Sequence, residues 1–61
     1  MARNEYKMKY TLEYWSGGEQ HYETIEASRL NDAIMKGQRW LQLHNLQDVI
    51  DRNEWGISKD E

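Results

Sequence analysis

The sequence predicts a small α+β domain with the element order strand, strand, helix, strand (ββαβ). Three observations predict it. Apolar and polar residues alternate over residues 7–15, a glycine pair follows directly, and from residue 28 onward apolar residues recur with the helical period. These features take up more than half of the 61 residues. We therefore expect one domain, with an ordered core over about residues 6–57 and frayed ends.

The first strand and its turn are the clearest elements. Period two over this segment places the apolar side chains on one face of a strand and the polar ones on the other. The turn Ser16-Gly17-Gly18-Glu19 contains two residues that readily take positive φ, as a tight hairpin requires. The apolar positions of this strand are Met8, Tyr10, Leu12 and Tyr14.

The second strand is expected over residues 20–27, and its buried face has two interpretations. Ile25 and Ala27 share a face, but the same face continued backwards reaches Glu23 and His21 rather than Tyr22. Either the inner face of the sheet ends near Ile25, or a bulge turns Tyr22 inward.

An amphipathic helix is expected after Ser28, whose hydroxyl makes it a good N-cap. Asp32 follows in the first turn, where a negative charge suits the helix dipole. Gly37 is unfavourable in a helix interior, so its place within the apolar stripe indicates close contact between helix backbone and sheet. Asn45 is a plausible left-handed C-cap. The stripe consists of Leu30, Ala33, Ile34, Gly37, Trp40, Leu41 and His44.

The last segment has two interpretations. It is either one strand from about Val49 to Trp55, or a short hairpin that turns between Asp51 and Glu54. We adopt the single strand, because a helix that crosses over from strand two can set strand three beside strand one. This connection gives a three-stranded sheet in the order 2-1-3.

Composition bounds the class of protein. The chain has no cysteine and a formal net charge of −3, and no stretch of five residues holds more than two of its basic residues. Scattered basic residues argue against a dedicated nucleic-acid binder, because neutralising phosphates takes clustered Lys and Arg. No apolar run approaches the roughly 18 residues of a membrane span, and residues 1–7 lack the apolar stretch of a signal peptide. We expect a cytoplasmic protein without a membrane segment.

No combination of residues indicates catalysis. Zinc sites need three or four ligands, whereas His21 with Glu23 offers two, and His44 is expected to pack or cap at the edge of the core. Carboxylate pairs such as Asp48/Asp51 and Glu23/Glu26 are expected to be solvated surface. Neither a nucleophile–base motif nor a phosphate loop is present. We predict no catalytic residue, no metal and no cofactor, and a protein that is not an enzyme.

The aromatic residues are more informative, since all are Tyr or Trp. Such side chains tolerate half-burial and are over-represented at protein interfaces. Tyr10, Tyr14 and Trp40 are assigned to the core. Trp15 lies on the other face of strand one, and Trp55 is near the carboxyl end. These two either cap the edges of a thin core or belong to an interface.

The layout resembles the small ββαβ proteins that bacteriophages make early in infection, and among them inhibitors of host bacterial RNA polymerase. The matching stretches are residues 10–15, 26–34, Trp40 and 48–52. In that family an arginine of the third strand contacts the polymerase, and Arg52 is the closest position here, displaced by about one residue. The resemblance implies a non-catalytic inhibitor that binds a host protein in the host cytoplasm.

Our first hypothesis is therefore a protein-binding module. The surfaces predicted to bind are the outer side of the hairpin, with Glu13, Trp15 and Glu26, and the final strand, with Arg52 and Trp55.

Two alternative functions remain. Lys7, Lys9 and Arg52 could meet on the open face of the sheet and bind nucleic acid, with Trp15 as a stacking surface. The chain could also be an accessory subunit of a larger complex.

Self-association is expected to be weak. The edge of strand two carries Tyr22, Thr24 and Ile25 without a proline, and an unblocked edge invites pairing. Glu23 and Glu26 are expected to oppose a symmetric pair. We predict a monomer or a weak homodimer.

Overall fold

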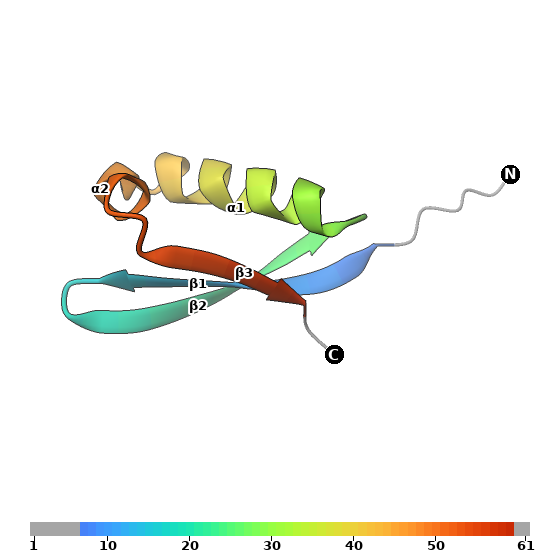
Figure 1. Ribbon diagram of the computed structural model, residues 1–61, viewed down its shortest axis with the longest axis horizontal. Coiled ribbons are helices and arrows are strands. Elements are labelled where there is room, and N and C mark those ends of the chain that lie inside the picture. Colours follow the sequence, from blue (N-terminus) through green and yellow to red (C-terminus); the bar gives the residue numbers. More distant parts are fainter. Residues whose placement is uncertain (1–6, 60–61) are drawn as a thin grey trace, which may run out of the picture.

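The computed structural model describes residues 7–59 and shows the predicted α+β architecture with an additional short helix. The strands form one sheet in the order β2-β1-β3, and both outer strands run antiparallel to β1. Helix α1 lies along one face of this sheet, and α2 lies at the end where α1 terminates (Figure 1). The elements are β1 (Met8–Ser16), β2 (Glu19–Ala27), α1 (Leu30–Leu43), α2 (Gln47–Asp51) and β3 (Trp55–Lys59).

The β1–β2 hairpin turns on the two glycines, as predicted. Gly17 has φ 62° and Gly18 has φ 80°, the paired positive values of the two-residue turn that matches strand twist. From this turn the register runs without interruption to Met8 opposite Ala27. The ladder contains no bulge, so Tyr22 lies on the face away from α1. The first interpretation of strand two is therefore confirmed, since the buried part of its inner face ends at Ile25.

The core lies between the inner face of the sheet and the two helices. Leu12, Leu41 and Val49 are its largest fully buried side chains. Burying a side chain of this size contributes about 1.5–3 kcal/mol relative to leaving it exposed. Tyr14, Trp40, Leu46, Ile50, Trp55 and Ile57 pack around the buried cluster, which consists of Tyr10, Leu12, Ile25, Ala27, Ala33, Leu41 and Val49.

The start of α1 differs from the prediction. Ser28 is not the N-cap, because the chain enters the helix at Arg29, which has an extended backbone and makes no side-chain cap bond. The Ser28 backbone N–H instead donates to Asp32 Oδ2 at 3.4 Å. The carboxylate of the first turn thus reaches back to the incoming chain, and it also pairs with Lys36 Nζ at 3.4 Å.

The buried line of α1 is narrower than the predicted stripe. Ala33, Gly37 and Leu41 are buried at successive four-residue steps. Leu30 and Ile34 stay 49% and 37% exposed, because they flank the line of the helix surface that faces the sheet. At Gly37 the approach is close, since a Cβ there would lie 2.8 Å from Ile57 Cδ1.

Helix α1 ends at an asparagine, as predicted. Asn45 has φ 62°. The Leu46 N–H donates to the Leu41 carbonyl at 2.8 Å, and the Asn45 N–H donates to the Gln42 carbonyl at 3.2 Å. This is the Schellman pattern, which satisfies carbonyls of the last turn and turns the chain away from the helix axis.

The segment after Asn45 is helical, which overturns both predicted forms of it. The single strand from Val49 to Trp55 is wrong, and so is the hairpin, because residues 47–51 form α2. Leu46, Val49 and Ile50 have the i, i+3, i+4 spacing of a helix face, and all three pack in or against the core. A five-residue helix is too short for this pattern to stand out in sequence.

A second asparagine ends α2 in the same way. Asn53 has φ 58°, its N–H donates to the Ile50 carbonyl at 2.9 Å, and the Glu54 N–H donates to the Val49 carbonyl at 3.0 Å. This turn delivers the chain to β3 beside β1, with Trp55 opposite Tyr14.

Strand β3 extends further than expected. Ser58, which was expected to fray, pairs with Thr11, and Lys59 pairs with Tyr10.

Within residues 7–59 no helix is long and apolar enough to cross a membrane. The expected fraying of the first residues falls on residues 1–6, outside the described part of the chain.

The close contact at Gly37 yields a stability prediction. We expect Gly37→Leu to destabilise the protein by about 1–3 kcal/mol, because overpacking against Ile57 outweighs the gain in helix propensity. Urea unfolding followed by tryptophan fluorescence measures the change. A stabilised Gly37→Leu variant would mean that this face of α1 does not contact the sheet.

A double-mutant cycle serves as the control. Ile57→Val removes the δ-methyl group that a Cβ at residue 37 would meet. Gly37→Ala should therefore be more favourable in the Ile57→Val background than in the wild type, by about 0.5 kcal/mol or more. Equal effects in the two backgrounds would locate the strain elsewhere.

The turn at Asn45 yields a second prediction. Asn45→Gly should keep or slightly raise the free energy of unfolding, whereas Asn45→Val should lower it by about 1–2 kcal/mol, because a β-branched residue strains the left-handed conformation. Thermal unfolding measured by circular dichroism compares the two variants. Equal stability of both would contradict a left-handed residue at this position.

Candidate protein-binding face

The face of the sheet opposite α1 is covered by no element within residues 7–59 (Figure 1). We call it the outer face. Side chains alternate between the two faces of a strand, so the neighbours of the buried Tyr10 and Leu12 in β1 belong to the outer face. The antiparallel registers then identify the residues of β2 and β3 that lie beside them. They are Lys9, Thr11, Glu13 and Trp15 of β1, Gln20, Tyr22, Thr24 and Glu26 of β2, and Gly56 and Ser58 of β3.

Two large aromatic side chains stand at the hairpin end of the outer face. Trp15 is 46% exposed and Tyr22 is 59% exposed. Trp15 lies opposite Gln20 and Tyr22 lies opposite Glu13, so the two aromatics are diagonal neighbours on the same face. Diagonal neighbours of this size are within reach of each other. The β1–β2 hairpin thus presents two exposed aromatic side chains on one face.

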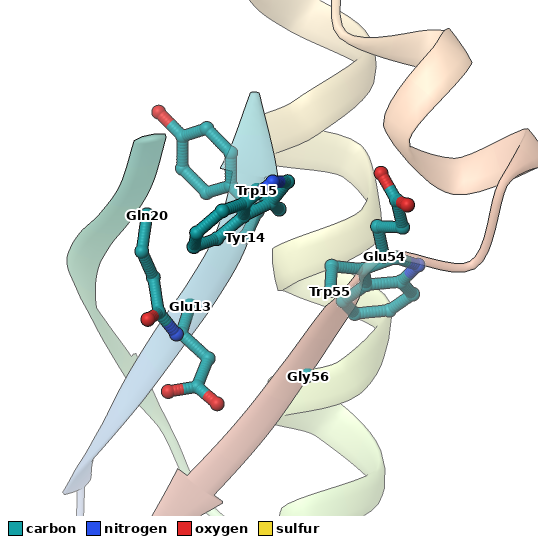
Figure 2. A pocket seen from close by; sticks show the side chains of 7 residues that line it. All are labelled: Glu13, Tyr14, Trp15, Gln20, Glu54, Trp55 and Gly56. Carbon is teal, nitrogen blue, oxygen red and sulfur yellow. The ribbon is translucent and has the colours of Figure 1, made fainter. Parts of the chain in front are cut away.

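A hollow of about 460 Å³ adjoins Trp15 (Figure 2). Gly56 lies opposite Glu13 on β3 and has no side chain to fill the space above it; a Cβ there would meet nothing within 4 Å. The backbone N–H of Trp15 donates to the backbone carbonyl of Glu54 at 3.1 Å, and this bond joins the end of β1 to the residue that precedes β3. The lining residues are Glu13, Tyr14, Trp15, Gln20, Glu54, Trp55 and Gly56.

The structure brings together three of the five residues predicted to bind a protein. Glu13, Trp15 and Trp55 all line the hollow, although Trp55 also packs against the core. Glu26 lies at the far end of the outer face, opposite Lys9. Arg52 is not in the final strand but in the turn between α2 and β3.

Four residues of this surface were missed from the sequence. Tyr22 could have been found by extending the alternation of strand two, because its parity places it with Glu26 rather than Ile25. Gln20 has the same parity as Tyr22, so the same alternation places it on this face. Glu54 and Gly56 had no such signal, since their positions depend on where β3 begins.

Arg52 is held by two carboxylates. Its Nε donates to Glu54 Oε1 and its Nη1 donates to Asp48 Oδ2, both at 2.9 Å. The hydrogen bond from Arg52 lowers the pKa of Asp48 below its ordinary value, and the bonds to Glu54 and then Asp48 raise the pKa of Arg52. The guanidinium therefore serves the α2–β3 turn and is not displayed as an unpaired cation.

The two histidines have structural partners. His21 Nε2 donates to the Ser16 carbonyl at 3.2 Å, and its ring stacks on Tyr14 with centroids 5.0 Å apart. His44 Nδ1 donates to the Trp40 carbonyl at 2.9 Å and stacks on the Trp40 ring at 3.9 Å. Among the residues that the structure describes, no group of three or more His, Cys, Asp or Glu is placed to hold a metal ion.

Comparisons with protein-family models, curated proteins and solved structures found no match for this chain. The functional interpretation therefore rests on the sequence and on the geometry of the outer face.

The ion pair at Arg52 yields a titration prediction. Arg52→Met should raise the pKa of Asp48 towards its ordinary value, because the bond that favours the carboxylate is lost. Arg39→Met changes the net charge equally and should leave the pKa of Asp48 unchanged. Carboxyl carbon NMR titration measures both. An unchanged pKa in Arg52→Met would rule out this pairing in solution.

The direction of the shift also sets a pH dependence. A lowered pKa in the folded state means that the Asp48–Arg52 pair stabilises the fold above the unfolded-state pKa, about 3.9 for an aspartate. This contribution is lost as the pH falls through the lower pKa of the folded state. It should be absent from the acid unfolding curve of Arg52→Met.

Proposed function

We propose that this protein is a non-catalytic protein-binding module that contacts its partner through the outer face, centred on Trp15. The observation that carries the proposal is the half-exposed Trp15 beside an open hollow, on the face of the sheet that no element within residues 7–59 covers. Tryptophan and tyrosine dominate the binding energy of many interfaces, especially where an adjoining pocket receives a partner side chain. A side chain of the partner would enter the hollow over Gly56 and pack against the Trp15 ring.

The charges of the outer face favour a protein over a nucleic acid. Glu13 and Glu54 line the hollow, and Glu26 lies at the other end of the face. Carboxylates at these positions repel phosphates. Within residues 7–59, Lys9 is at the Glu26 end and Arg52 is held by two carboxylates at the hairpin end, so these two residues do not form the basic cluster that a nucleic-acid site needs.

The narrower form of the proposal is an inhibitor of a host bacterial protein, such as RNA polymerase. Its support is the shared order of two strands, helix and final strand in the phage proteins that this chain resembles. The counterpart arginine does not support it, because residues 47–51 are helical and Arg52 precedes β3. We therefore place the contact at Trp15 and the hollow rather than at Arg52.

A binding experiment tests the proposal. Tagged protein is used to capture a stoichiometric partner from a bacterial lysate, and the affinity of the purified pair is then measured by calorimetry. Trp15→Ala should weaken binding by about 2 kcal/mol or more, roughly thirtyfold. Recovery of no stoichiometric protein partner would refute the proposal.

A second variant separates binding from folding. Gly56→Leu places a side chain in the hollow where a Cβ meets nothing within 4 Å, so it should keep the fold while blocking the partner. Met35→Ala truncates a side chain that is also exposed but lies on α1, away from the outer face, and it should bind like the wild type. If Gly56→Leu folds and binds normally, the hollow is not the binding site.

A further inference from the structure

Strand β2 forms an edge of the sheet, and its backbone groups alternate in direction. In a two-residue hairpin the pair that flanks the turn, Ser16 and Glu19, exchanges hydrogen bonds, and bonded pairs recur at every second residue. Residues 19, 21, 23, 25 and 27 therefore bond to β1. The N–H and C=O groups of residues 20, 22, 24 and 26 point away from the sheet.

One contact confirms this alternation and limits the free edge. Lys36 Nζ reaches the Glu26 carbonyl from the open side at 3.0 Å. Lys36 thus occupies the edge next to the start of α1. Within residues 7–59 no strand pairs with the remainder of the β2 edge. The outward N–H and C=O groups of Gln20, Tyr22 and Thr24 therefore remain available for hydrogen bonds to another strand. An open edge of this kind accepts another strand.

We propose that this edge pairs with the same edge of a second copy of the chain, antiparallel and centred on Tyr22. In this register Tyr22 lies opposite Tyr22 of the second copy, and Gln20 lies opposite Thr24 of the second copy. The outward backbone groups of Gln20, Tyr22 and Thr24 then all have partners, and the two sheets become continuous. The proposal concerns the β2 edge and is independent of the partner proposed for the outer face.

Side-chain charges select this register. His21 and Glu23 share the inner face, and pairing centred on Tyr22 sets His21 of each copy opposite Glu23 of the other. Centring on Glu23 would set the two Glu23 carboxylates opposite each other. Centring on His21 would set Glu19 opposite Glu23. Like charges directly opposite each other destabilise a ladder, so both neighbouring registers are disfavoured. The expected opposition of Glu23 to a symmetric pair holds only for these registers.

A groove between β2 and α1 supplies a second complementary contact. Ile25, Lys36 and Arg39 are among the residues that line it. In the proposed register Glu19 of the second copy lies opposite Ile25, on the same inner face. Its carboxylate therefore enters the groove beside Lys36 and Arg39. Within the described residues Lys36 has an ion pair with Asp32, whereas none is found for Arg39.

Cysteine cross-linking tests the register, because the chain has no cysteine of its own. Opposed residues of a bonded antiparallel pair have Cα atoms about 5.5 Å apart, within disulfide range. Tyr22→Cys should therefore form a disulfide dimer at least about tenfold faster than Met35→Cys, an exposed control on α1. Gln20→Cys and Thr24→Cys should cross-link when mixed but not alone. A smaller excess for Tyr22→Cys, or faster cross-linking of Thr24→Cys alone, would overturn the proposal.

Sedimentation equilibrium up to about 1 mM protein tests the association without cross-links, over the range expected for a weak dimer. Thr24→Pro removes an outward N–H that the intramolecular ladder does not use, and it should weaken the dimer at least about tenfold, while Thr24→Ala should not. A monomeric wild type over this range would overturn the proposal.

A charge exchange between Glu19 and Arg39 tests the same dimer if Thr24→Pro does not fold. Glu19→Arg and Arg39→Glu should each weaken the dimer, and the double variant should recover association, because the exchanged charges again face each other. Failure of the double variant to recover would overturn the placement of Glu19 beside Arg39.

Discussion

The close approach of α1 to the sheet at Gly37 is the contact on which the rest of this structure depends. Gly37 places helix backbone against Ile57 of β3 and Leu12 of β1, and a Cβ there would require the end of the Ile57 side chain to move. Ala33 and Leu41 lie one turn before and one turn after Gly37 on the same buried line of α1, so all three face the sheet together. A chain of 61 residues buries only about 60% of the surface that its unfolded form exposes, so close packing of helix and sheet contributes a large share of its core.

Two asparagine turns then set the path of the chain. Asn45 and Asn53 both adopt the left-handed conformation, and each closes a helix by the same hydrogen-bond pattern. Helix α2, between them, inserts the fully buried Val49 at the open end of the core. The second turn places the start of β3 beside the end of β1. The Glu54 carbonyl, Trp55 and Gly56 are thereby positioned around Trp15, so the hollow is a consequence of how α2 ends.

Within residues 7–59 the helices cover only one face of the sheet (Figure 1). All buried residues belong to the inner face of the sheet and the two helices, while the outer face keeps its aromatic and charged side chains in solvent. The edge of β2 is a third surface, which Lys36 closes at one end only. Tyr22 and Gln20 belong to both surfaces. The proposed partner on the outer face would contact Trp15 and the hollow over Gly56, whereas the proposed second copy would use the backbone groups of the β2 edge. The two associations can therefore be separated by substitution.

The sequence by itself determined the hairpin, the inner face of β1, the helix and its buried glycine, because these depend on alternation, turn chemistry and helical period among neighbouring residues. Trp15 and Glu13 were recognisable as surface residues for the same reason. Only the tertiary structure decided the helical form of residues 47–51, the start of β3 and the hollow formed by Gly56, Glu54 and Trp55. Val49 and Ile50 are β-branched and locally favour a strand, in line with the strand predicted there. The packing of Val49 in the core and of Ile50 against it selects the helix, and this helix separates Arg52 from the face that holds Trp15.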